Sequence, residues 1–241
     1  MTKINLRFPL SVLWMGLFVS TGLLHFNHIA VAQEAPGTFI DRLGGLERPR
    51  GLAFGPDGDL YVRSAKTDRV LRYDGETGEE KRAFVTSGRG GLDSPAGLVF
   101  GPDGDLYVSS ANTDAVLRYD GSTGESKGAF VPAGGDLRVP EGLVFGPDGD
   151  LHVSSSLTNE VLRYDGATGA FKGAFVTAGS GGLGSPTGLA FGPDAHLYVI
   201  NGSSNEVLRY DGTTGAFQAA FVGTSGGLSL SFALTFGPDD D

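Results

Sequence analysis

Residues 95–131 read PAGLVFGPDGDLYVSSANTDAVLRYDGSTGESKGAFV, and this stretch decides the fold because close copies of it recur along the chain. Each copy begins with a proline, and the steps from one proline to the next are 46, 45 and 46 residues. A fixed period of this length is typical of a repeat architecture. We therefore expect four complete units and a partial fifth, at 49–85, 95–131, 140–176, 186–222 and 232–241.

Each unit carries the local signals of four short strands and none of a helix. In the second unit the strands are expected at 97–100, 105–110, 115–119 and 128–131. The Gly-Pro-Asp-Gly sequence at 101–104 is typical of a hairpin turn, because proline fixes φ and glycine accepts the left-handed conformation. No window shows a sustained apolar repeat at helical spacing. Four strands per repeat predict an all-β fold, a β-propeller of four-stranded antiparallel blades.

The two ends of the repeat array do not complete a unit. Residues 38–40 resemble a fourth strand, and the partial unit at 232–241 stops inside its first hairpin. We expect an incomplete or open relative of a six-bladed propeller, with two uncovered blade faces. A few hundred Å² of apolar surface on each face corresponds to about 10 kcal/mol of unrealised burial. The sequence therefore predicts self-association through these faces, or a chain that is a shortened relative of a longer protein.

The N-terminal 32 residues have the pattern of a secretory signal peptide. Lys3 and Arg7 precede an apolar core, and Ala30-Val31-Ala32 is typical of a cleavage site. The alternative is an uncleaved membrane anchor, but the apolar core is short for a span. We expect a signal peptide at 1–32, a linker at 33–37 and the propeller at 38–241, in a protein that is secreted to an extracellular or periplasmic location.

Composition limits the classes of partner and chemistry. Forty glycines and 12 prolines accompany 40% hydrophobic residues, which is typical of a turn-rich folded chain. The absence of cysteine excludes disulfides and a thiol nucleophile. A formal charge of −10 argues against nucleic acid or an anionic membrane as a partner, because both attract basic surfaces. A protein or a carbohydrate remains as the expected ligand.

Residues that all units share are expected to serve folding. The phenylalanines of the first strands should fill the space between blades: Phe54, Phe100, Phe145 and Phe191. Arg118 and its equivalents recur beside aspartates, and we expect a ladder of ion pairs between neighbouring blades. The Gly-Pro-Asp-Gly-Asp turns lack the ligand spacing of a calcium loop, so they are interpreted as hairpins. His152 replaces a tyrosine and is expected to be a packed or edge residue.

Two positions of each unit supply the candidates for a binding site at the rim of the central channel. They lie where the first strand begins or directly after the second strand: Arg50, Thr187, Glu141, Ser64, Ser110, Ser155 and Asn201. Glu141 and Asn201 belong to adjacent units and form a weak candidate site for Ca²⁺ or Mg²⁺. The alternative is a solvated glutamate and a turn asparagine. The sequence shows no convincing catalytic triad, and we predict no catalytic residue.

The pattern P-x-G-L-x-F-G-P-D-G-D-L-Y-V followed by N-T-D-x-V-L-R-Y-D-G resembles the NHL repeat and related propellers. These include the virginiamycin B lyase (streptogramin lyase) and gluconolactonase-like families. The resemblance implies a propeller fold over nearly all of 39–239. The gluconolactonase-like family binds a divalent cation through a glutamate ahead of the first inner strand, a position that Glu141 fills here. The lyase family uses a histidine and glutamate cluster with magnesium, which His152 and His196 do not reproduce.

We therefore expect a secreted NHL-like propeller that serves as a non-catalytic binding or structural module and needs no cofactor. The alternative is a lyase or lactonase that depends on a divalent metal ion bound at Glu141.

Overall fold

The computed structural model describes residues 45–229 and 231–237. The expected signal peptide, linker and strand-like segment at 38–40 lie outside the described residues. Within these residues the structure consists of strands, short 3₁₀ turns and loops, and the strands form four antiparallel sheets of four. The expected all-β propeller of four-stranded blades is confirmed. No helix in the part of the chain that the structure describes is long and apolar enough to cross a membrane.

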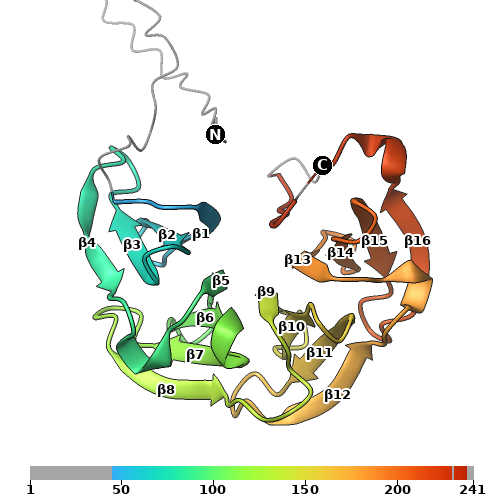
Figure 1. Cartoon of the computed structure of the whole chain (residues 1–241), viewed down its shortest axis with the longest axis horizontal. Coiled ribbons are helices and arrows are strands. Elements are labelled where there is room, and N and C mark those ends of the chain that lie inside the picture. Colours follow the sequence, from blue (N-terminus) through green and yellow to red (C-terminus); the bar gives the residue numbers. More distant parts are fainter. Residues whose placement is uncertain (1–44, 230, 238–241) are drawn as a thin grey trace, which may run out of the picture. The chain divides into compact units, whose positions relative to one another are not determined.

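The four blades follow one another around a central axis, with the first strand of each blade nearest the axis (Figure 1). Blade one contains β1 (Pro49–Phe54), β2 (Leu60–Ser64), β3 (Arg69–Tyr73) and β4 (Glu80–Val85). Blade two contains β5 (Pro95–Phe100), β6 (Leu106–Ser110), β7 (Ala115–Tyr119) and β8 (Ser126–Val131). Blade three contains β9 (Pro140–Phe145), β10 (Leu151–Ser155), β11 (Glu160–Tyr164) and β12 (Phe171–Val176). Blade four contains β13 (Pro186–Phe191), β14 (Leu197–Asn201), β15 (Glu206–Tyr210) and β16 (Phe217–Val222).

Aromatic side chains pack edge to face between neighbouring blades. The ring of Tyr61 lies 4.8 Å from Phe84 of its own blade and 4.8 Å from Phe100 of blade two. Tyr107 repeats the arrangement, with its ring centroid 5.1 Å from that of Phe145 in blade three. Such T-shaped contacts add stabilisation beyond the buried area. The prediction that the first-strand phenylalanines fill the space between blades is confirmed for the internal interfaces.

The two terminal blades expose apolar side chains that internal blades bury. On blade one, Leu52 is 41% exposed and Phe54 is 48% exposed, whereas Leu98 of blade two is 8% exposed. On blade four, Phe221 is 56% exposed, whereas its equivalent Phe130 is 9% exposed. The described residues thus carry apolar surface at both ends of the array, as expected. Self-association through these faces stays a prediction.

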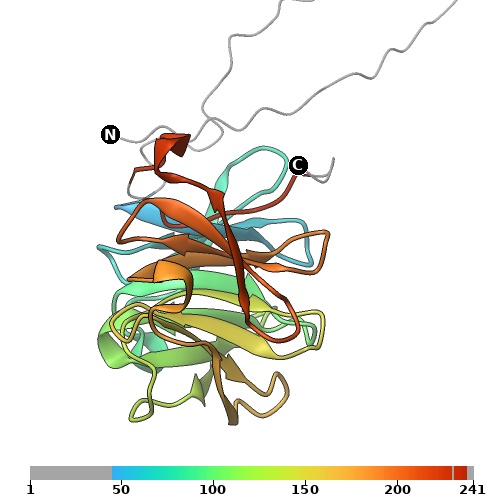
Figure 2. The ribbon, with the colours of Figure 1, turned by 90° about the vertical axis from the view of Figure 1, so that its right-hand side faces the viewer.

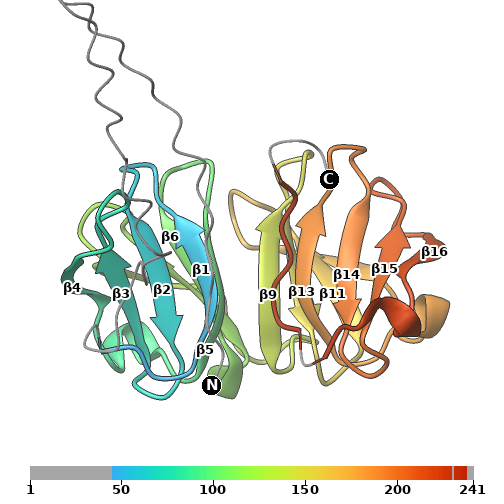
Figure 3. The ribbon, with the colours of Figure 1, turned by 90° about the horizontal axis from the view of Figure 1, so that it is seen from above.

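The segment 231–237 lies against blade four and begins to cover it (Figures 2 and 3). The ring of Phe236 lies 4.9 Å from Tyr198, at an interplanar angle of 69°. These values are close to the 4.8 Å and 72° between Tyr61 and Phe100. Phe236 therefore occupies the position that the first-strand phenylalanine of a following blade takes at the internal interfaces.

The arginines that recur in every unit, Arg118 and its equivalents, form ion pairs within their own blades. The prediction of a ladder of ion pairs between neighbouring blades was therefore wrong. In blade two, Arg118 Nε donates to Asp105 at 2.6 Å, and Lys127 Nζ lies 2.8 Å from the same carboxylate. Arg118 is in register with Tyr107 on the adjacent strand. The hydroxyl of Tyr107 donates to Asp103 in the same hairpin. The cross-strand register brings the charges together inside one sheet.

His152 is buried between blades, which confirms its expected packed position. It is 1% exposed, and its ring lies 4.6 Å from Phe175 and 5.2 Å from Phe191. Both ring nitrogens are buried and have no hydrogen-bond partner among the described residues. Burial lowers the pKa of His152, because the charged imidazolium is poorly solvated there. A buried polar group without a partner destabilises the folded state.

His152→Tyr is expected to raise the free energy of unfolding by about 1–2 kcal/mol. The other blades place a tyrosine here, and its hydroxyl donates to the hairpin aspartate, as Tyr107 does to Asp103 at 2.9 Å. Urea unfolding at pH 7 measures the change. Because the unfolded histidine binds a proton more readily, wild-type stability falls as pH drops below about 6.5. The gain from the substitution should therefore be larger at pH 5.5, and a variant less stable than wild type at both pH values would contradict this account.

Candidate functional site

The first strands of blades two to four lie so close to their neighbours at the axis that only glycine fits at one position in each. A Cβ at Gly97 would lie 2.5 Å from the carbonyl oxygen of Glu141, and a Cβ at Gly142 would lie 2.5 Å from that of Thr187. A Cβ at Gly188 would lie 2.7 Å from the carbonyl oxygen of Phe232. These contacts place the first strands of blades two to four and the C-terminal segment side by side around one pocket at the axis. We call it the channel pocket.

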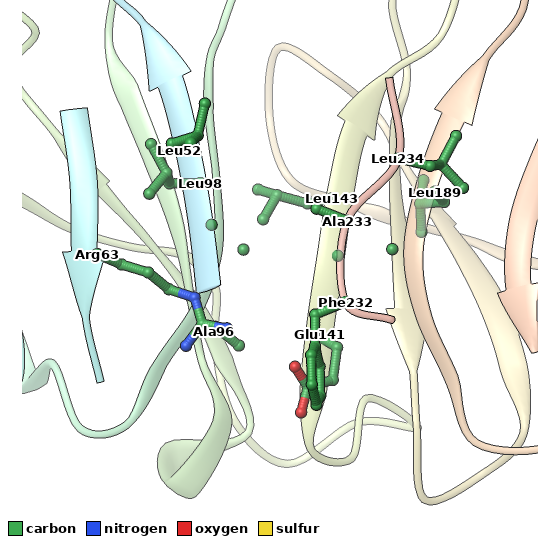
Figure 4. Close-up of a pocket in the computed structure, with 14 residues that line it drawn as sticks. Leu52, Arg63, Ala96, Leu98, Glu141, Leu143, Leu189, Phe232, Ala233 and Leu234 are labelled. Carbon is green, nitrogen blue, oxygen red and sulfur yellow. The ribbon is translucent and has the colours of Figure 1, made fainter. Parts of the chain in front are cut away.

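The channel pocket has charged and apolar walls (Figure 4). Arg63 reaches it from β2, Glu141 from β9 and Phe232 from the C-terminal segment. Between Arg63 and Glu141 lies the small side chain of Ala96, from blade two. The remaining side chains are four leucines that each follow a glycine of the first strands, Leu52, Leu98, Leu143 and Leu189, together with Ala233 and Leu234 of the C-terminal segment.

Arg63 is a buried arginine that the sequence reasoning missed. It is 3% exposed, and its Nη1 donates to the carbonyl oxygen of Pro95 at 2.6 Å. Its Nε is buried and has no hydrogen-bond partner among the described residues. Burial lowers the pKa of Arg63 to about 10, and the negative charge of Glu141 opposes that shift. The signal was available, because the equivalent positions carry Ser109, Ser154 and Ile200.

The serines at the equivalent positions show what Arg63 replaces. The hydroxyl of Ser109 accepts from Gly97 N at 2.6 Å and donates to the carbonyl oxygen of Glu141 at 2.6 Å. Ser154 makes the same pair of bonds, to Gly142 N and to the carbonyl oxygen of Thr187. These hydroxyls join the first strands of two blades. In blade one a charged side chain occupies this place and brings a guanidinium group into the pocket wall.

Glu141 is half-buried in the opposite wall. Burial raises the pKa of its carboxyl group, and the positive charges of Arg63 and Arg50 act in the other direction. None of the ion pairs among the described residues includes Glu141, and its carboxylate accepts no hydrogen bond from them. Arg63 and Glu141 thus face each other across the pocket without direct pairing.

Arg50 and Thr187 contact the C-terminal segment beside the pocket. The guanidinium carbon of Arg50 lies 3.9 Å above the ring centroid of Phe232, which is a cation–π contact. Thr187 is buried, and its hydroxyl donates to the carbonyl oxygen of Ser231 at 3.0 Å. The structure therefore brings three of the predicted rim residues, Arg50, Glu141 and Thr187, to the channel end of the first strands.

The other predicted rim residues form a separate set, which fastens loops. All four are buried, and each accepts a hydrogen bond from the backbone of the loop before its own blade. The acceptors are the side-chain oxygens of Ser64, Ser110, Ser155 and Asn201, and the donors are the amides of Glu47, Asp93, Arg138 and Gly184. This set holds each blade to the connection from the previous one, and it does not line the channel pocket.

The donor set does not suit a divalent cation at Glu141. Asn201 uses both amide atoms on the backbone, accepting from Gly184 N at 3.0 Å and donating to the carbonyl oxygen of Gly182 at 3.0 Å. Within residues 45–229 and 231–237, no three acidic or histidine side chains lie close enough together to hold a metal ion. The charges of Arg63 and Arg50 beside Glu141 also oppose a cation.

No protein-family model and no curated protein matches this sequence. Solved structures are similar to it. Virginiamycin B lyase from Staphylococcus aureus matches with a TM-score of 0.59 at 17% identity, over 80% of this chain and 61% of the lyase. A gluconolactonase from Xanthomonas campestris matches with a TM-score of 0.59 at 20% identity, over 72% of this chain and 61% of the enzyme. A putative gluconolactonase matches with a TM-score of 0.61 at 23% identity, over 79% and 68%.

The chain has the fold of these propellers. The resemblance to streptogramin lyase and gluconolactonase propellers is confirmed at the level of architecture, which is what identities below 25% establish. The chain spans 61% of the length of the lyase from Staphylococcus aureus.

Proposed function

We propose that the protein is a secreted, non-catalytic binding module of the NHL-like propeller type, and that the channel pocket is its ligand site. The observation that supports this most is the pair Arg63 and Glu141. Arg63 is charged where the other units carry Ser109, Ser154 and Ile200, and Glu141 is acidic where the other units carry Arg50, Ala96 and Thr187. The side chain of Arg63 is buried and that of Glu141 is half-buried, and the two form no ion pair with each other.

A buried charge without a partner destabilises the folded state. The neighbouring units show that an uncharged residue suffices at the position of Arg63, because Ser109 joins two first strands with two hydrogen bonds. Arg63 makes one hydrogen bond to the neighbouring blade, to the carbonyl oxygen of Pro95, and places a charge where the serine places a neutral hydroxyl. A ligand that pairs with the charges accounts for their presence, and concave pockets with few polar groups are typical binding sites. The signal-like segment at 1–32 supports the proposal of secretion.

Backbone amide NMR of the ¹⁵N-labelled protein tests this proposal. A panel of disaccharides, short peptides and small aminocarboxylates is added one compound at a time. We expect at least one compound to shift the amides of the channel glycines Gly97, Gly142 and Gly188, and to leave distant hairpin amides unchanged. The Arg63→Ser variant, which carries the residue of the neighbouring units, is the matched control and should lose the response. A panel that leaves these three amides unmoved would count against the channel as the binding site.

The metal-dependent alternative gives a different result. If the protein is a lyase or lactonase built on Glu141, Ca²⁺ or Mg²⁺ should raise the melting temperature, and Glu141→Ala should remove that rise. We expect no such Glu141-dependent shift, because the two arginines beside the carboxylate disfavour a cation.

A further inference from the structure

The channel pocket presents one positive and one negative side chain on facing walls, and this arrangement specifies a class of ligand. The guanidinium group of Arg63 belongs to blade one, and the carboxylate of Glu141 belongs to blade three (Figure 4). The residue between them, Ala96 of blade two, has a side chain of one carbon. Arg63 and Glu141 form no ion pair with each other, although both line the pocket. A small molecule bound between them is favoured when it carries a charge opposite to each wall.

The guanidinium group of Arg63 is held in place before any ligand binds. Its Nη1 donates to the carbonyl oxygen of Pro95 at 2.6 Å, and the side chain is 3% exposed. Its buried Nε has no acceptor among the described residues. A fixed guanidinium group in a pocket wall is a strong site for a carboxylate, because it offers charge-assisted hydrogen bonds in a defined geometry.

The carboxylate of Glu141 offers the opposite charge. It accepts no hydrogen bond from the side chains or backbone of the residues described. An anion alone, seated on Arg63, would be repelled by Glu141, and a cation alone on Glu141 would be repelled by Arg63 and Arg50. A ligand with one charge of each sign neutralises both walls. Leu98, Leu143 and Phe232 line the rest of the pocket and suit a short hydrocarbon linker.

We infer that the channel pocket binds an aminocarboxylate, with the carboxylate group of the ligand on Arg63 and its ammonium group on Glu141. This inference rests on the proposed function, because it names the ligand class of the same pocket. Arg50 stacks on Phe232 and adds positive charge on the side of the pocket that holds the C-terminal segment. The pocket selects the ligand by charge at both ends and by the length of the chain between them.

Isothermal titration calorimetry with matched probes tests the inference. The probes are 4-aminobutyrate, butyrate and butylamine, which share one carbon chain, together with glycine and 6-aminohexanoate to vary the separation of the charges. We expect the best aminocarboxylate to bind at least tenfold more tightly than butyrate and butylamine. A tenfold difference corresponds to about 1.4 kcal/mol. Affinity should depend on chain length, with one length preferred.

Two variants assign the charges. Glu141→Gln keeps the size of the side chain and should bring the affinity for the best aminocarboxylate down to that for butyrate. Arg63→Ser should abolish the binding of both, and serine is the residue that the neighbouring blades hold at this place. If Arg63→Ser does not fold, the comparison of probes on wild type and on Glu141→Gln still decides the inference.

Three results would overturn it, and the first two separate it from the proposed function. If butyrate binds as tightly as every aminocarboxylate in an Arg63-dependent manner, the zwitterionic ligand is wrong and the channel remains the binding site. If none of the probes binds while a disaccharide or peptide shifts the channel glycine amides, the same conclusion holds. If no compound shifts those amides, both the inference and the proposed function fail.

Discussion

Gly121→Ala is expected to lower the free energy of unfolding by at least about 3 kcal/mol, at the upper end of the usual effect of overpacking. A Cβ at Gly121 would lie 1.7 Å from the carbonyl oxygen of Gly104, which belongs to the first hairpin of the same blade. This neighbour is backbone, so no side-chain rotation relieves the overlap. The two hairpins of the blade must separate, and the strands that they join must shift with them. Urea unfolding followed by circular dichroism measures the loss.

Gly135→Ala is the matched control, because a Cβ at Gly135 would have no heavy atom within 4 Å. Its stability is expected to stay within about 0.5 kcal/mol of wild type. A Gly121→Ala variant as stable as this control would show that the hairpins do not approach as described. The same contact recurs in the other blades, at Gly75, Gly166 and Gly212, with separations of 1.8, 1.8 and 1.7 Å. The glycine of the repeated Arg-Tyr-Asp-Gly sequence is therefore required by close approach of the two hairpins.

Much of the fold was predictable because the same turn and strand signals recur in four units of the sequence. The turn at 101–104 and the short strand at 106–110 are encoded within a few residues, so hairpins follow from local chemistry. The expected second and third strands of blade two agree with β6 and β7 to within one residue at each end. The packing of Phe100 between blades also followed, since a residue present in every unit serves what every blade shares.

The site was less predictable, because it depends on where side chains from different units meet. Comparing units found Glu141, which differs from its equivalents at the start of a first strand. The same comparison applied to the middle of the second strand would have found Arg63. That position was passed over because sequence alone does not show that the first strands converge closely enough for a second-strand side chain to reach the channel. Ser110 was also a candidate for the channel rim, yet its hydroxyl is used on the backbone of its own loop.

Asp105→His is expected to lower the free energy of unfolding by about 2–3 kcal/mol at pH 7. Asp105 is 5% exposed, and its carboxylate lies 2.6 Å from Arg118 Nε and 2.8 Å from Lys127 Nζ. Removing one partner from a buried ion pair typically costs about 3–5 kcal/mol. The loss should be smaller here because the side chains of Arg118 and Lys127 are 30% and 41% exposed, so water solvates them when the carboxylate is gone. Chemical unfolding of the single variant measures it.

Blade four supplies the control for this prediction. It carries His196 where blade two has Asp105, and Gln218 where blade two has Lys127. In blade four, therefore, both the carboxylate and its lysine partner are replaced. We expect Lys127→Gln to cost less stability in the Asp105→His background (the double variant) than in wild type, because Lys127 has then already lost Asp105 and keeps only its ion pair with Asp120, at 3.2 Å. Equal costs in the two backgrounds would show that Lys127 and Asp105 do not act as a pair.

The same network sets the response to acid. Burial alone would raise the pKa of Asp105, but the hydrogen bonds from Lys127 and Arg118 hold it below its usual range. In the neighbouring turn, the hydrogen bonds from Lys127 and Thr123 lower the pKa of Asp120 to about 2. Because the unfolded carboxylates bind protons more readily, their contribution is fully present above about pH 4 and is lost as pH falls toward 2. The double variant lacks the Asp105 carboxylate and the lysine that both aspartates share, so its stability should fall less steeply between pH 4 and 2. Parallel pH profiles of wild type and double variant would locate the acid response elsewhere in the blades.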